Sequence, residues 1–130
     1  MSHFTQIQTK ITDLNCLKTA LEDIGFSYRE GDIKVKGWRG KTEKVELVVN
    51  TGSMYGIGFK RNEDGFYEVV ADWWGVQSRT GIKQRTFINR LNQRYAYHKV
   101  LTEAKNKGFT VAEDEVMEDK TIKLVVRKWQ

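Results

Sequence analysis

The chain reads VELVVNTGSMYGIGFKRNEDGFYEVVA from residue 45 to residue 71. Apolar side chains recur at every second position of residues 45–49, 55–59 and 67–71, a pattern typical of strands with one buried face. The segment Asn62-Glu63-Asp64-Gly65 has the composition of a hairpin turn. Together these patterns predict an antiparallel meander.

A helix is predicted on either side of the meander. On the N-terminal side, Thr12 or Asp13 can cap a helix whose apolar residues recur at helical spacing until Gly25. On the C-terminal side, residues 82–107 carry a broad apolar stripe that ends at Gly108. The other predicted elements are a weak strand over 4–11, strands over 26–29 and 33–36 joined by a turn at Glu30-Gly31-Asp32, an end of the meander at Trp73-Trp74-Gly75, a polar connection over 77–81, and a C-terminal strand pair that begins at 109 and at 122.

The predicted order is therefore β-α-β-β-β-β-β-α-β-β. This order indicates a single α+β domain over residues 1–130, with a largely antiparallel sheet and two helices packed on one face. Around Gly25 and Gly108 the succession of helix, glycine, strand, acidic turn and strand recurs. It is either a weak internal repeat or the pattern that any helix-to-hairpin unit needs.

Composition excludes several classes of protein. A hydrophobic content of 39% with 12% aromatic residues predicts a packed core. The single Cys16 excludes an internal disulfide and a thiolate cluster for zinc or iron–sulfur. No stretch approaches the ~20 apolar residues of a membrane span, and the N-terminus lacks the apolar core of a signal peptide. We therefore expect a soluble protein that is not exported.

Positive charge is concentrated on the second predicted helix. Of the chain's 22 basic and 17 acidic residues, seven basic residues and one acid, Glu103, lie between Ile82 and Lys107. Because arginine binds carboxylate or phosphate through two parallel hydrogen bonds, this helix is a candidate surface for an anionic partner. The candidate contacts on it are Arg85, Arg90, Arg94 and Lys99. Alternatively, the helix has only a solvated outer face, or the acid-rich segment 113–119 neutralises it.

Aromatic residues flank this charge and suggest further contacts. Tyr95 and Tyr97 follow Arg94, and such rings could stack on nucleic-acid bases, although packing in the core is the favoured role for Tyr95. In an extended chain, Trp73 and Trp74 point to opposite faces, so one ring is expected to be buried and the other exposed. An exposed tryptophan beside Arg79 or Trp38 would be a binding anchor, whereas the alternative is that both rings cap the sheet edge.

The sequence predicts no enzyme, no metal site and no cofactor. His3, His98 and Cys16 do not have the spacing of metal ligands. The glycines of residues 52–58 fit neither phosphate-loop pattern, and a strand rather than a helix follows them. An enzymatic hypothesis would require a pocket in which His98, Glu68 and Asp72 converge.

Four segments resemble the hypothetical chloroplast open reading frame thirty-five family of algal plastids and cyanobacteria. They are residues 1–7 (MSHFTQI), 67–72 (YEVVAD), 94–98 (RYAYH) and the C-terminal segment with GFTV at 108–111 and IKLVVRKW at 122–129. The resemblance implies a plastid stroma, a cyanobacterial cytoplasm or a virus of cyanobacteria as the source. The family is of unknown function, so the resemblance implies no catalytic or cofactor residue.

The leading hypothesis is a non-catalytic binding or assembly module that docks an acidic protein partner. It would use the basic helix, with Trp73 or Trp74 as an apolar anchor. The alternative is a nucleic-acid-binding module that uses the same arginines and Tyr97. Neither hypothesis predicts an oligomeric state.

Overall fold

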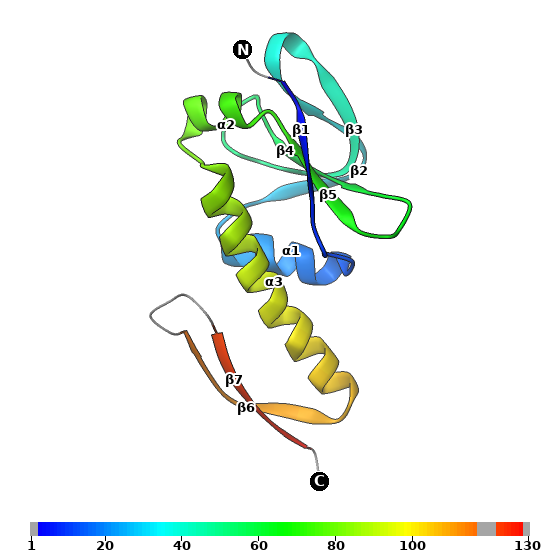
Figure 1. Ribbon diagram of the computed structural model, residues 1–130, viewed down its shortest axis with the longest axis vertical. Helices are drawn as coiled ribbons and strands as arrows, with labels where there is room; N and C mark the ends of the chain where they lie inside the picture. Colours follow the sequence, from blue (N-terminus) through cyan, green and yellow to red (C-terminus); the bar gives the residue numbers. More distant parts are fainter. Residues whose placement is uncertain (1–2, 117–121, 129–130) are drawn as a thin grey trace. The chain divides into compact units, whose positions relative to one another are not determined.

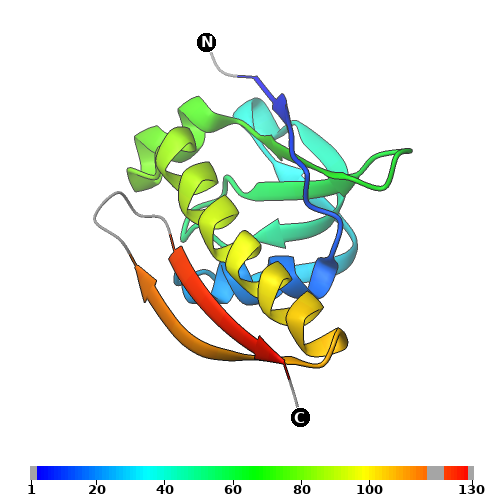
Figure 2. The same cartoon turned by 60° about the horizontal axis from the view of Figure 1, so that its bottom comes forward.

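The computed structural model describes residues 3–116 and 122–128, and the side chains of residues 3–109. The elements follow in the order β1 (Thr5–Gln8), α1 (Leu14–Asp23), β2 (Tyr28–Lys36), the 3-10 turn η1 (Trp38–Gly40), β3 (Thr42–Val49), β4 (Ile57–Arg61), β5 (Tyr67–Ala71), α2 (Trp73–Thr80), α3 (Gln84–Asn106), β6 (Phe109–Val116) and β7 (Ile122–Lys128), as labelled in Figure 1. Strands β1 to β5 form an antiparallel sheet in the order β1-β5-β4-β3-β2, and β6 pairs with β7 (Figure 2). The predicted α+β class is confirmed, with one helix more and one strand fewer than predicted.

The chain divides into two compact units. The sheet unit contains the residues up to 12 and residues 25–88, which include the five-stranded sheet, α2 and the first turn of α3. The helix–hairpin unit contains residues 13–24 and the residues from 89 onward, which include α1, most of α3 and the β6–β7 hairpin. The single domain over residues 1–130 and the packing of two helices on one face of the sheet stay predictions.

Strand β2 corrects the predicted turn at Glu30-Gly31-Asp32. The strand runs through this segment without reversing, and its pairing with β3 shifts register between Glu30 and Ile33. Gly31 has a φ of 125°, a conformation that glycine adopts without steric strain. Both a turn and a β-bulge can contain a glycine with positive φ. Here Gly31 lies in a bulge, and the strand continues beyond it.

The sheet curls until side chains from its two edges meet. Phe4, just before β1, packs on the buried cluster of Val35, Val45, Val48 and Val70, and so does Ile33 of β2. Gln6 Nε2 of β1 donates a hydrogen bond of 3.1 Å to Glu43 Oε1 of β3. One buried apolar cluster of the sheet unit therefore lies within the curl of its own sheet.

Two glycines of the meander are required by this packing. A Cβ atom on Gly56 would lie 2.8 Å from Val48 Cγ1, and one on Gly58 would lie 2.9 Å from Val45 Cγ1. Both distances are shorter than the van der Waals contact of two carbon atoms. The chain at Gly56 and Gly58 can therefore lie this close to the valines of β3 only because neither residue has a side chain. Gly56 and Gly58 thus serve packing, whereas Gly52 adopts a positive φ of 83°.

Helix α2 replaces the extended end of the meander predicted at Trp73-Trp74-Gly75, and it includes most of the predicted polar connection. Asp72 caps it, because Asp72 Oδ1 accepts a hydrogen bond of 3.1 Å from the Gly75 backbone N–H. Asp72 Oδ2 accepts another, of 3.0 Å, from the Trp38 backbone N–H. At the other end of α2, Gly81 adopts a φ of 77° and ends the helix. Asp72 is fully buried, so both hydrogen bonds lie inside the fold.

We expect Gly75→Ala to destabilise the protein by about 3 kcal/mol, because the new methyl group would overpack the core. Its Cβ would lie 1.8 Å from Tyr55 Cε2 and 1.9 Å from Tyr55 Cδ2. Urea unfolding followed by tryptophan fluorescence measures the loss. Gln77→Ala, at an exposed position of the same helix, is the control and should change stability by less than about 0.5 kcal/mol. Equal stability of the two variants would contradict the tight contact.

Candidate functional site

The tryptophan pair divides into one buried and one exposed ring, as predicted. Trp73 is 8% exposed, and its ring lies 5.8 Å from that of Phe87 between centroids. Trp74 is 58% exposed. The predicted geometry differs, since consecutive residues of a helix point about 100° apart rather than to opposite faces. The exposed ring is therefore that of Trp74.

Trp74 belongs to a surface of the sheet unit that combines aromatic rings with arginines. The rings of Trp74 and Trp38 are nearly perpendicular, and their centroids lie 6.3 Å apart. The Arg39 guanidinium lies 5.6 Å from the centre of the Trp38 ring, and that of Arg79 lies 4.9 Å from the centre of the Tyr55 ring. We call Trp38, Arg39 and Trp74 the tryptophan–arginine surface, and Arg79 is a further cation on the helix that carries Trp74. Among the described side chains, no carboxylate pairs with either arginine.

The sequence suggested only part of this surface. It indicated Trp38 and Arg79 as neighbours that would make an exposed tryptophan an anchor. Arg39 was missed, and its φ of 56° is the only positive φ of a non-glycine residue in the described part of the chain. Its neighbours Gly37 and Gly40 were the available indication, since they predict an exposed loop whose tip carries Trp38 and Arg39.

Two of the predicted contacts on α3 have partners within the helix–hairpin unit. Arg94 Nε lies 2.9 Å from Asp23 Oδ2, and the Arg94 guanidinium lies 4.5 Å from the centre of the Tyr97 ring. Lys99 Nζ lies 3.6 Å from Asp13 Oδ2 and 3.7 Å from Glu103 Oε1. Acidic residues of α1 and its cap thus neutralise part of the charge on α3. The side chains of the acid-rich segment 113–119 lie outside the described residues.

Arg85 and Arg90 differ from these two residues. Both are exposed, and no carboxylate of the described side chains pairs with them. Arg85 lies in the first turn of α3, which belongs to the sheet unit, whereas Arg90 belongs to the helix–hairpin unit. The role of all four α3 side chains in binding stays a prediction.

Each residue of the enzymatic hypothesis has a structural partner of its own. Asp72 caps α2, Glu68 Oε1 accepts a hydrogen bond of 2.6 Å from Gln8, and His98 Nε2 lies 2.5 Å from Asp23 Oδ2. Cys16 is buried, and burial raises the pKa of its thiol, which disfavours the nucleophilic thiolate.

The described part of the chain contains neither a cluster of metal ligands nor a membrane-spanning helix. No group of three metal-ligating side chains occurs among those residues. No described helix has both the length and the apolar character needed to cross a membrane.

Asp23 has two polar partners on α3, Arg94 and His98. Burial would raise the pKa of its carboxyl, but hydrogen bonds and the charges of His98 and Arg94 outweigh burial and lower it. A lowered pKa in the folded state means that the ionised carboxylate stabilises the fold above the unfolded pKa of about 3.9. This stabilisation disappears as the pH falls through the folded pKa.

Asp23→Asn should therefore lower the free energy of unfolding by about 1 kcal/mol near pH 7, discounted for a partly exposed site. The difference from the wild-type protein should vanish well below about pH 4. Denaturant titrations at several pH values measure both. Asp32→Asn is the matched control, because the Asp32–Lys44 pair is exposed and should contribute almost nothing. A deficit in Asp23→Asn that is independent of pH would disprove the role of the ionised carboxylate.

Comparison with known proteins gives a consistent family. Residues 20–125 match a family described as "Protein of unknown function (DUF1257)". The chain is 36% identical to the "Uncharacterized protein ycf35" of Pyropia yezoensis, over 99% of this chain and 98% of that one. The proteins of the same name from Cyanophora paradoxa and Guillardia theta are 34% and 35% identical, each over 100% of this chain and 99% of the relative. No solved structure matches the chain significantly. The resemblance expected from the four sequence segments is thus confirmed, and the chain belongs to the ycf35 family of proteins of unknown function.

Proposed function

We propose that this chain is a non-catalytic binding module that docks an acidic protein partner through the tryptophan–arginine surface. One observation carries the proposal: the exposed ring of Trp74 contacts the ring of Trp38, and the guanidinium of Arg39 lies over that same Trp38 ring. Tryptophan and arginine are the residues most enriched among those that dominate binding energy at protein interfaces. Arg85, in the first turn of α3, adds a cation from the same unit.

Preorganisation favours binding at this surface. The backbone of Trp38 is held by the buried carboxylate of Asp72, and the Trp74 side chain projects from a helix whose start the same carboxylate caps. Side chains that are already positioned lose less conformational entropy when a partner binds. The backbone segments that carry Trp38 and Trp74 are therefore already held by Asp72 before a partner binds.

The charge of the surface indicates the chemistry of the partner. Arg39, Arg79 and Arg85 have no carboxylate partner among the described side chains, so their positive potential is available to an incoming surface. Complementary charge raises the rate of encounter and excludes partners of like charge. An acidic protein surface with an apolar patch fits both the arginines and the exposed ring.

Nucleic acid is the weaker alternative. Stacking on bases needs accessible aromatic faces, and Tyr97 already contacts Arg94 and the ring of His98, whose centroid lies 5.0 Å away. Binding of RNA or DNA is therefore treated as a result that would contradict the proposal.

The relatives suggest where the module acts. They are plastid-encoded proteins of a red alga, a glaucophyte and a cryptophyte. We propose the plastid stroma or the cyanobacterial cytoplasm as the location. These three relatives give no support to a cyanobacterial virus as the source.

The test begins with co-purification of the tagged chain from cells that encode it, followed by calorimetry with the purified partner. Trp74→Ala should weaken binding by about thirtyfold, the loss typical of a central tryptophan at an interface. Arg39→Glu/Arg79→Glu should lower the association rate and its dependence on salt. Phe66→Ala, which removes an exposed ring in the β4–β5 turn, should leave the affinity unchanged.

Two results would contradict this proposal. One is a partner whose affinity does not respond to Trp74→Ala. The other is RNA or DNA binding whose log–log salt slope falls by about one for each arginine removed, since such a slope reports contacts with phosphates.

A further inference from the structure

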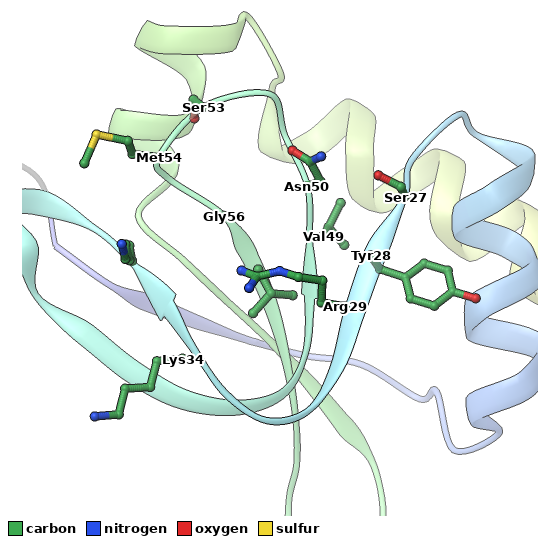
Figure 3. A pocket seen from close by; sticks show the side chains of 11 residues that line it. Ser27, Tyr28, Arg29, Lys34, Val49, Asn50, Ser53, Met54 and Gly56 are labelled. Atoms are coloured by element: carbon green, nitrogen blue, oxygen red, sulfur yellow. The ribbon is translucent and has the colours of Figure 1, made fainter.

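A second site lies elsewhere on the sheet unit. It is a pocket of about 350 Å³ between β2, the end of β3 and the segment that leads into β4 (Figure 3). Its size is within the range of pockets that hold small molecules. Its residues are Ser27, Tyr28, Arg29, Lys34, Lys36, Val48, Val49, Asn50, Ser53, Met54 and Gly56.

The charge of the pocket has one sign. Arg29, Lys34 and Lys36 line it, and no acidic residue does. Within the described part of the chain, no carboxylate pairs with any of the three. Three cations around one concavity repel one another and concentrate a positive potential there, which an anion would relieve.

All three side chains line the pocket, although the β-bulge at Gly31 separates Arg29 from Lys34 and Lys36 along β2. Arg29 and Lys34 are an odd number of residues apart and would face opposite sides of a regular strand. The bulge interrupts this alternation, because β2 has one extra residue between the pairs Glu30–Leu47 and Ile33–Val45. The cluster was therefore hidden in the sequence, where a turn was predicted at Gly31.

Further groups in the pocket suit a ligand with a phosphate and a less polar body. Asn50 Oδ1 accepts a hydrogen bond of 2.9 Å from the Gly52 backbone N–H, which orients the side chain and leaves its amide N–H groups without a partner among the described residues. Gly56 contributes only backbone to the pocket lining, since Val48 fills the space that a side chain there would take. Met54 is 71% exposed, and its flexible thioether adapts to varied apolar surfaces.

We propose that this pocket binds a small phosphorylated molecule. The phosphate lies among Arg29, Lys34 and Lys36, where arginine donates paired hydrogen bonds and the lysines act as point charges. The remainder of the ligand contacts Val48 and Met54. This site is independent of the docking function, because it shares no residue with the tryptophan–arginine surface.

The experiment uses the full-length protein and inorganic pyrophosphate as the minimal probe. Backbone amide shifts followed by NMR should change saturably at Arg29, Ser53 and Gly56, with a midpoint below about 10 mM. Calorimetry should show that Arg29→Gln/Lys36→Gln weakens binding at least about tenfold, since each removed contact is charge-assisted. Lys10→Gln/Lys41→Gln removes the same charge at exposed positions outside the pocket, and it should change the affinity less than about twofold.

Each other outcome overturns the proposal. Equal loss in the two double variants would show that pyrophosphate responds only to net charge. Amide shifts that lie away from the pocket, or none at about 10 mM probe, would remove the site, and this mapping on the wild-type protein holds even if a variant fails to fold. A lipid headgroup carries the same phosphate chemistry, so vesicles containing phosphatidic acid form a separate arm. Binding to these vesicles without binding to pyrophosphate would overturn the small-molecule site.

Discussion

The buried carboxylate of Asp72 is the interaction on which the sheet unit depends. It is the only charged side chain among the described residues that is fully buried, and both of its oxygens accept backbone hydrogen bonds. One bond starts α2 at the end of β5, and the other holds the loop between β2 and β3. That loop also packs against the N-terminal segment, because a Cβ on Gly37 would lie 2.8 Å from Phe4 Cζ. A buried carboxylate without these donors would cost several kcal/mol, so the three segments are positioned together.

Both proposed sites follow from how this unit folds. The Asp72 bonds set the spacing between Trp38 and Trp74, so the pairing of the exposed Trp74 with the half-buried Trp38 is a consequence of a buried polar contact. The pocket lies at a different feature, the bulge at Gly31 that interrupts the alternation of β2, and basic residues from both sides of the bulge line it. In the helix–hairpin unit, by contrast, Asp13 and Asp23 pair with Lys99 and Arg94 and reduce the charge that α3 presents. Two of the four candidate cations on α3 therefore have carboxylate partners in their own unit, and the share of α3 in binding an anionic partner stays a prediction.

Local patterns predicted the elements that depend on local physics. The Asp13 cap, the left-handed Gly25, the Asn62–Gly65 turn and the long α3 all match the structure, because neighbours in the sequence determine each of them. The predictions of a turn at Glu30-Gly31-Asp32 and of an extended end of the meander at Trp73-Trp74-Gly75 were wrong for a shared reason. A positive-φ glycine fits a turn or a bulge equally well, and an aspartate before two tryptophans fits a loop or a helix cap. The choice depends on contacts with distant residues, such as the Trp38 N–H, and these do not appear in a local pattern.

Amide hydrogen exchange in Asp72→Asn tests the role of this carboxylate most directly. Asparagine caps helices about as well as aspartate, but its amide N–H₂ presents donors where Asp72 Oδ2 accepts from Trp38. We expect the Trp38 amide to lose its protection from exchange while the Gly75 amide and the β4–β5 amides keep theirs. Unchanged protection at both Trp38 and Gly75 would contradict the claim that one carboxylate bridges the loop and the helix.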